Sequence, residues 1–222
     1  MEKIFTNVDF TPFFLSLKLA FFTTILLLFI SIPISYFLAF SKFRFKVFLE
    51  AFISLPLVLP PTVLGFYLLI LLSKNGILGN LWEKLFENPL IFRFEGILIA
   101  SLVFSLPFMV HPLTAGFRSV NKNLIEASYT LGKSKLTTLF KIIIPNIKHS
   151  FITGIVLTFI HTVGEFGVVL MVGGSIEGET KVISISIYDA VESLDYTTAH
   201  IYAGILLIFS FLILVFVYLP NK

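Results

Sequence analysis

The chain has 222 residues, of which 57% are hydrophobic and 13% charged, with a net charge of +3 and a mean hydropathy of +0.98. Soluble domains average about 45–50% apolar and about 25% charged residues, so this composition indicates an integral membrane protein. The lack of cysteine excludes disulfides, thiol catalysis and cysteine-based metal sites. No cleavable signal peptide is expected, because the first residues lack a basic region and include Glu2, Asp9 and Pro12.

Five apolar segments are long enough to cross a bilayer, which takes about 20 residues of helix. We expect these spans at 13–40, 47–72, 96–117, 150–173 and 199–219 of a single all-α membrane domain. The second span contains Pro56, Pro60 and Pro61. Because each proline removes a backbone donor, this span cannot be one regular helix. Both a kinked packing helix and a break that lines a pathway fit this pattern, since broken backbone at membrane depth is tolerated beside a water-filled cavity.

The basic residues are distributed unevenly between the connecting segments. Segments 41–46 and 118–149 together hold nine Lys and Arg, whereas 74–95 and 175–198 hold four. The positive-inside rule therefore predicts that the first two segments are cytoplasmic. With five spans, the amino terminus is then expected outside and the carboxyl terminus in the cytoplasm.

Segment 118–149 has the pattern of two short helices around Gly132. Asn123 followed by Glu126 is typical of a capped helix start. Gly132 suits the left-handed turn that ends a helix. A second helix is expected from about Ser134, with Pro145 as its limit.

The spacing of this segment resembles the EAA loop of the membrane subunits of ABC importers, commonly written EAA-x3-G-x9-I-x-LP. Here Ser128 replaces the second Ala and Ile144 replaces Leu. The resemblance implies a type I permease fold of about five spans, in which this loop is the coupling helix that docks into a separate ATP-binding subunit. The residues to which it assigns coupling are Glu126, Ala127, Ser128, Gly132, Ile142 and Pro145.

The resemblance covers essentially the whole chain and narrows to the molybdate permease branch, through segments 55–69, 105–110, 164–174 and 178–188. It implies a homodimer that carries molybdate or tungstate across the bacterial cytoplasmic membrane. An extracytoplasmic oxyanion-binding protein delivers the substrate, and the partner ATPase binds ATP and Mg. Sulfate permeases are similar around the loop and the GEFG segment but typically longer, which makes sulfate or thiosulfate the alternative substrate. Val168-Val169 departs from the Ala-Thr common after GEFG and loses a hydroxyl.

The fourth span is the most polar and contains the deepest acid, Glu165. A carboxylate inside a membrane costs about 2.5–3.5 kcal/mol on insertion scales and is a functional candidate by default. Because it repels an oxyanion, we expect Glu165 to accept hydrogen bonds from backbone or hydroxyl groups and shape a gate, or alternatively to contact a partner subunit. The candidates for the pathway and its gate are Pro60, Pro61, Thr62, Thr158, Thr162, Gly164, Glu165 and Gly167. His111 is expected to be interfacial and bonded to backbone, with a buried functional group as the alternative.

Two other classes of function fit the sequence less well. An ion-coupled secondary transporter typically has inverted repeats and paired intramembrane charges, whereas this chain has one deep acid and no visible repeat. An intramembrane enzyme needs a constellation such as HExxH, which does not occur here. The sequence also lacks GxxxxGK[ST], so energy must come from a partner. No cofactor, metal or nucleic acid is expected to bind this chain, whose remaining partner is membrane lipid.

Overall fold

The computed structural model describes residues 9–218, and this range contains helices and no strand. Three helices are long and apolar enough to cross a membrane, and two bent helix pairs bring the possible number of spans to five. The elements are α2 (Thr11–Phe40), α3 (Lys46–Val58), α4 (Pro61–Leu72), α5 (Ile77–Phe86), α6 (Phe94–Ser119), α7 (Lys122–Thr130), α8 (Lys135–Thr138), a π-helical turn (Leu139–Ile143), α9 (Ile144–Asn146), α10 (Lys148–Val163), α11 (Gly167–Gly173), α12 (Ile183–Glu192) and α13 (Tyr196–Tyr218).

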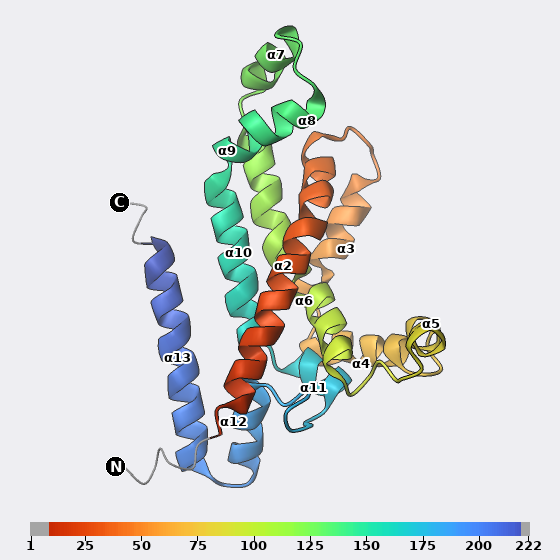
Figure 1. Ribbon diagram of the computed structural model, residues 1–222, viewed down its shortest axis with the longest axis vertical. Coiled ribbons are helices and arrows are strands. Elements are labelled where there is room, and N and C mark those ends of the chain that lie inside the picture. The colour runs from red at the N-terminus through yellow and green to blue at the C-terminus, as the bar shows by residue number, and fades with distance from the viewer. Residues whose placement is uncertain (1–8, 219–222) are drawn as a thin grey trace.

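Helices α2, α6 and α10 form the central bundle, and α7 and α8 project from one end of it (Figure 1). The bundle can pack closely because small residues lie at its crossings. At Gly116 an added Cβ would lie 2.4 Å from Oγ of Ser150, which brings α6 against α10. A buried cluster fixes the base of the α7–α8 projection, and it contains Leu27, Met109, Leu113, Phe117, Val120, Ile143 and Ile147.

The expected break in the second span is confirmed, and its position is now defined. α3 continues through Pro56, and the chain bends by 113° between α3 and α4 at Leu59 and Pro60. Pro61 occupies the first turn of α4, where its missing N–H costs no helical hydrogen bond. α4 therefore runs across the bundle toward α5 (Figure 1).

The fourth apolar segment differs from the expected span 150–173. α10 ends at Val163, residues 164–166 are not helical, and α11 follows as a separate short helix. α11 packs against α4 at Gly65, where an added Cβ would lie 2.8 Å from Cβ of Met171. The chain is therefore broken twice, at Pro60 before α4 and at Gly164 before α11. The two helices that follow these breaks pack against each other.

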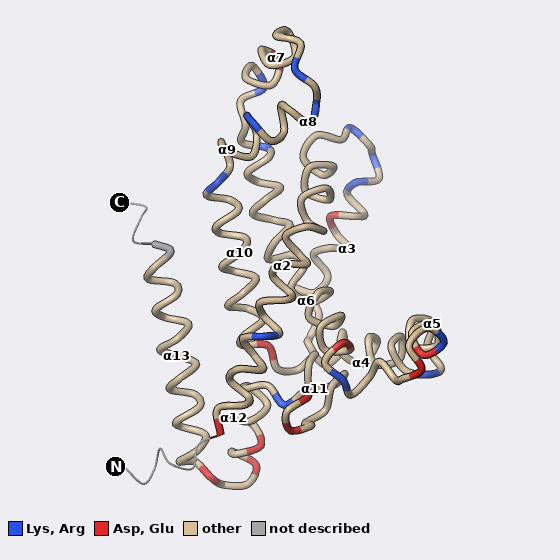
Figure 2. Tube along the Cα trace, in the orientation of Figure 1, with Lys and Arg blue, Asp and Glu red and all other residues tan. Residues whose placement is uncertain are grey.

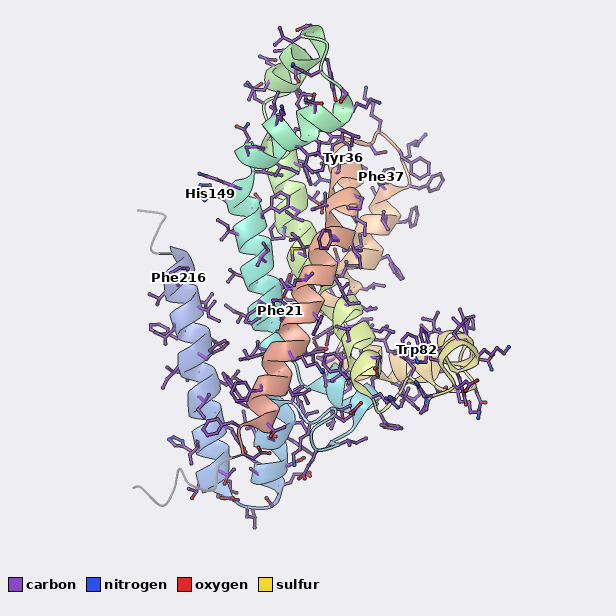
Figure 3. All side chains as sticks on the ribbon, in the orientation of Figure 1. Phe21, Tyr36, Phe37, Trp82, His149 and Phe216 are labelled. Carbon is purple, nitrogen blue, oxygen red and sulfur yellow. The ribbon has the colours of Figure 1, made fainter. Side chains whose placement is uncertain are left out.

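The segments 74–95 and 175–198, expected as polar loops, contain helices α5 and α12. Sequence patterning missed them because each is only ten residues long. Figure 3 shows Trp82 on α5 well away from α13, which carries Phe216 and diverges from the bundle toward its carboxyl end. Lys and Arg gather near α7, α8 and the α2–α3 connection, whereas Asp and Glu gather around α12 and α5 (Figure 2). We call these two ends of the molecule the α7 end and the α12 end.

Candidate functional site

The first part of the site is the knob, residues 121–146, at the α7 end. The cap of α7 is Asn121, whose side chain accepts a hydrogen bond from the amide of Asn123 at 2.9 Å. The prediction that Asn123 is the cap is therefore wrong by two residues. Glu126 is exposed and has no side-chain hydrogen bond within the described residues, so it does not close a capping box.

Gly132 ends α7 as the sequence predicted, with φ +72°. The amide of Lys133 donates to the carbonyl of Ser128 at 3.1 Å, and the amide of Gly132 donates to that of Tyr129 at 2.9 Å. This pair of bonds is a Schellman motif, which satisfies carbonyls at the helix end. Only a residue without Cβ adopts this φ at no steric cost.

Ser128, where the family pattern has Ala, joins the two helices of the knob. Its side chain is buried, and its Oγ lies 2.8 Å from Oγ1 of Thr138 on α8. Thr138 in turn donates to the carbonyl of Ser134 at 3.0 Å. Because one Thr138 proton serves that carbonyl, Ser128 is the donor to Thr138. The substitution therefore adds a hydrogen bond that holds α7 on α8.

The second half of the knob leads into the membrane helix α10 across one non-helical residue, Ile147. Its helical backbone passes through the π-helical turn and α9 and ends at Asn146, one residue beyond the expected limit at Pro145. The turn that contains Ile142 has i→i+5 hydrogen bonding, a form that often marks functional positions. The axis then bends by 73° at Ile147 into α10. The knob thus connects directly to α6 before it and to α10 after it.

The outer surface of the knob is apolar and basic. Glu126, Ala127, Gly132 and Pro145 are exposed, and Ile142 is half-buried. Large apolar side chains also face outward, including Leu131 at 76% and Leu136 at 69% exposure. An exposed apolar patch rimmed by charge is typical of a protein interaction site. Its other members are Leu124, Tyr129 and Phe140, with Lys133, Lys135 and Lys141 beside them.

The second part of the site is the break hollow, a volume of about 550 Å³ at the start of α4 and the gap between α10 and α11. Most of the predicted pathway residues meet here, although they come from two distant segments. Gly167 permits the approach, because an added Cβ would lie 2.9 Å from Cβ of Pro61. Pro60 precedes the hollow as the cap of α4. The lining residues are Pro61, Thr62, Phe104, Ile160, His161, Gly164, Glu165, Phe166 and Gly167.

Glu165 lies in the break with only 3% of its surface exposed. Neither carboxyl oxygen has a partner with full hydrogen-bond geometry among the described residues, but the hydroxyl of Ser101 on α6, which is also unpartnered, lies close to the carboxyl and is the one candidate for the expected bond. Its backbone is nevertheless held, because Ser184 Oγ on α12 donates to the Glu165 carbonyl at 2.6 Å. A buried carboxyl whose hydrogen bonds are incomplete among the described residues is costly, which makes Glu165 a candidate functional group.

Two of the predicted pathway residues lie elsewhere. Thr158 and Thr162 are buried on the face of α10 that packs on α6, outside the break hollow. Thr162 Oγ1 donates to the Thr158 carbonyl at 2.9 Å, and it lies 2.9 Å from Oγ of Ser105. Val168 and Val169, where the family often has Ala-Thr, are also fully buried in the core. The lost hydroxyl therefore leaves the lining of the hollow unchanged.

The sequence reading missed a stripe on α6 that connects the break hollow with the α7 end. Its residues recur at intervals of four and three, which places them on one helix face. Phe108 stacks on His161 with ring centroids 3.9 Å apart, and His111 lies 3.1 Å from Ser54 Oγ instead of bonding to backbone. The intervals of four and three in the sequence could have shown that these residues share one face of α6. They could not show that this face meets α3 and α10, which come from distant parts of the sequence. The stripe is Phe104, Phe108, His111, Ala115 and Arg118.

Two further hollows lie along this stripe. The α3 crevice, of about 380 Å³, includes Leu57, Phe108 and Leu157 and is almost wholly apolar. The Arg118 chamber, of about 400 Å³, lies between α2, α3 and α6 and shares His111 and Ala115 with the crevice. Polar side chains at membrane depth usually face a cavity or a partner. The stripe is therefore a candidate half of a passage that runs from the break hollow toward the α7 end.

Nothing in the described residues groups three or more potential metal ligands of the His, Asp and Glu type. Those residues therefore offer no metal centre of this type.

Residues 31–220 match the family described as binding-protein-dependent transport system inner membrane component. The chain is 43% identical to the molybdenum transport system permease protein ModB of Azotobacter vinelandii, over 94% of this chain and 92% of that protein. It is 33% identical to the putative molybdenum transport system permease protein YvgM of Bacillus subtilis, over 97% and 95%. The sulfate transport system permease protein CysT of Escherichia coli is 31% identical over 78% of this chain and 63% of its own length. This multi-pass membrane chain therefore belongs to the family of binding-protein-dependent transport system inner membrane components.

Proposed function

We propose that this chain is the permease subunit of an ATP-binding cassette importer for molybdate or tungstate. The observation that carries the proposal is that one pair of helices bears both parts of the site. α6 carries the stripe and leads into α7, while α10 follows the knob and ends at the break hollow. A partner that displaces the knob would therefore move two of the helices that line the passage, α6 and α10.

The substrate is inferred from the relatives and not from the lining residues. The two molybdenum permeases align over nearly the whole of both chains, whereas the sulfate permease leaves about a third of its own length unmatched. Molybdate, tungstate and sulfate are all tetrahedral oxyanions, so the same hydrogen-bond donors could serve any of them. Sulfate or thiosulfate is the alternative that the uptake experiment must distinguish.

The knob is the proposed docking site of the ATPase subunit. Its exposed apolar side chains supply the area, and its lysines favour an acidic rim on the partner. The sequence has no nucleotide-binding loop, so ATP and Mg are bound by that partner. In this scheme Glu126 and Gly132 contribute to the contact and to the shape of the knob.

Charge supports the proposed orientation. The basic α7 end is assigned to the cytoplasm by the positive-inside rule, which leaves the amino terminus outside and the carboxyl terminus inside. The acidic α12 end and α5 then face the extracytoplasmic binding protein. This places the knob on the side of the membrane where ATP is available.

A homodimer would complete the passage. Pro61, Thr62 and Gly164 at the wall of the break hollow are exposed, and a two-fold axis beside them would bring a second copy of the same hollow opposite. The second copy, or water between the copies, would then supply hydrogen-bond donors for Glu165, whose carboxyl oxygens have no fully formed bond among the described residues.

Reconstituted uptake tests the proposal. The complex with its ATPase, in liposomes supplied with the binding protein, is expected to accumulate molybdate only with ATP, and tungstate should compete while sulfate should not. Uptake of sulfate with no preference for molybdate would overturn the substrate. ATP-independent uptake, or uptake of no oxyanion, would overturn the class.

A further inference from the structure

The Arg118 chamber contains more hydrogen-bond donors than the packing of the helices uses. It lies at the α7 end, where the stripe on α6 meets the first turns of α3. Arg118, Thr114 and His111 come from α6, and Glu50 and Ser54 come from α3. The chamber is the only one of the three hollows along the stripe whose lining includes a cation.

Arg118 is only partly occupied. Its Nη2 contacts the carboxylate of Glu50 and donates to the carbonyl of Leu38 at 3.3 Å. A guanidinium has five N–H donors, and Nη2 carries two of them. Neither Nε nor Nη1 has a hydrogen-bond partner among the described residues. The side chain is 48% exposed, and three of its five N–H donors remain uncommitted.

Thr114 adds a second uncommitted donor. The residue is 5% exposed and lines the chamber, and its Oγ1 is buried without a partner in the described part of the chain. A helical threonine can satisfy its hydroxyl on the carbonyl four residues earlier, but this one does not. Because this oxygen is itself buried, it reaches an anion in the chamber only after the side chain rotates about its Cα–Cβ bond, and an anion that accepts its hydrogen bond there would relieve the cost of an unpartnered hydroxyl.

Ser54 and His111 form a fixed pair on the opposite side of the chamber. Ser54 Oγ donates to the carbonyl of Glu50 at 2.8 Å. Because its single proton is used there, Nε2 of His111 donates to Ser54 across the 3.1 Å contact. This pair holds the α3 wall against α6.

The donor set fits a tetrahedral oxyanion. Arginine binds such anions through paired N–H groups, and a hydroxyl adds a further donor. Glu50 weakens anion binding, because its carboxylate pairs with Arg118 and repels a second anion. A site of this kind binds weakly, and a transport pathway needs sites that release what they bind.

We propose that the Arg118 chamber is an oxyanion-binding site at the cytoplasmic end of the passage, in which Glu50 competes with the transported anion for Arg118. The inference rests on the proposed function for its choice of anion and for the side of the membrane. When the chamber is empty, Glu50 holds Arg118. An arriving anion takes the guanidinium and the Thr114 hydroxyl, and the returning carboxylate helps to expel it.

Direct binding tests this site without relying on transport. The complex with its ATPase is placed in nanodiscs of zwitterionic lipid, without the binding protein, and titrated with sodium molybdate, tungstate or sulfate. Glu50→Gln is expected to tighten binding at least tenfold, because it removes the competing charge. Arg118→Gln is expected to abolish binding. Thr114→Val, which keeps the shape and all charges, is expected to weaken it several-fold and covers the case in which the Arg118 variant does not fold.

Glu83→Gln is the matched control, because Glu83 forms an ion pair with Lys74 (2.9 Å) on and before α5, at the other end of the molecule. It should leave the titration unchanged. If Glu50→Gln binds no more tightly than the unaltered protein, the ion pair only fastens α3 to α6 and the proposal is overturned. Unchanged binding in both Arg118→Gln and Thr114→Val would contradict it equally.

A second arm separates a soluble anion from a lipid headgroup of the same chemistry. The Glu50→Gln titration is repeated with anionic phospholipid in the nanodisc. Retained binding supports a site for the transported anion, whereas complete displacement by the lipid would overturn that assignment. Uptake is measured in parallel on the unaltered complex. If uptake is ATP-driven but the titrations contradict the chamber, only the binding-site proposal is overturned. If no oxyanion is taken up, the proposed function itself is overturned.

Discussion

The knob exposes apolar side chains and satisfies its polar groups internally, whereas the break hollow buries polar groups that have no partner among the described residues. In the knob the backbone is satisfied internally, by the Asn121 cap, the Schellman motif at Gly132 and the Ser128–Thr138 bond, while large apolar side chains face outward. At the break hollow the apolar residues pack inward, while Glu165 and Nε2 of His161 are buried without partners among the described residues. The knob thus has the form of a rigid surface for a protein, and the break hollow that of an incomplete polar site.

The largest expected effect comes from placing charge on the apolar surface of the knob. The double variant Leu131→Asp, Leu136→Asp should lose copurification with the ATPase subunit, since residues at the centre of an interface contribute about 2 kcal/mol or more each, and 1.4 kcal/mol is about tenfold in affinity. Both side chains are exposed, so thermal unfolding of the isolated chain should be unchanged. Leu85→Asp on α5, equally exposed at the other end, is the control and should keep the ATPase. Full retention by the double variant would mean that the knob is not the docking surface.

Next in size is the close approach of α11 to α4. Gly167→Ala would place a Cβ 2.9 Å from the ring of Pro61, and overpacking of this kind costs about 1–3 kcal/mol. The variant should unfold at lower temperature than the unaltered protein. Gly164→Ala, three residues earlier, meets nothing nearer than 3.7 Å and should unfold at the unaltered temperature. Equal unfolding temperatures for the two variants would contradict the packing described at the break.

A smaller effect is expected at Gly132, where the strain is purely in the backbone. Nothing lies within 4 Å of an added Cβ, but φ is +72°, and a left-handed conformation costs an L-residue about 1–2 kcal/mol. Gly178, with φ +73° and equally open surroundings, is a matched control at the α12 end. Gly132→Ala and Gly178→Ala should destabilise the chain similarly, but only Gly132→Ala should weaken binding of the ATPase subunit. If both variants or neither affect that binding, the shape of the knob is not what the partner recognises.

Ser128→Ala should have the smallest effect. It removes the hydroxyl contact to Thr138, while Thr138 keeps its bond to the Ser134 carbonyl. A typical hydrogen bond contributes about 0.5–1.5 kcal/mol, and Ala is the residue that the family pattern carries here. Thermal unfolding should fall slightly, and ATP-driven uptake should be retained. Loss of uptake would show that Ser128 does more than join α7 to α8.

Much of the knob could be predicted from sequence, because the features that shape it are local. The helix end at Gly132 is determined by residues within about one helical turn of it. The spacing from Glu126 to Pro145 can be read directly along the sequence. The proline break before α4 was equally local. The cap at Asn121 was missed because Asn123 is an equally good capping residue and only the backbone conformation decides between them.

The break hollow could be predicted only in part. Gly164, Glu165 and Gly167 were recognised because a deep acid flanked by glycines is unusual in a span. Thr158 and Thr162 were expected to face the passage, but the face of a helix that is buried depends on its neighbours, and here α6 covers them. His161 and the stripe on α6 line hollows formed together with α3, α4 and α10. Their role could not be predicted, because these helices come from distant parts of the sequence.

Thiol accessibility at Thr62 tests the central claim, that the knob controls the break hollow, most directly. The chain has no cysteine, so Thr62→Cys introduces a single reactive thiol at an exposed position on the wall of the hollow. A membrane-impermeant thiol reagent is applied from each side to the complex in liposomes, with its ATPase either nucleotide-free or trapped after ATP binding. We expect labelling from the α7 side in the nucleotide-free complex and from the α12 side in the trapped complex. Labelling that stays on one side in both states would contradict it.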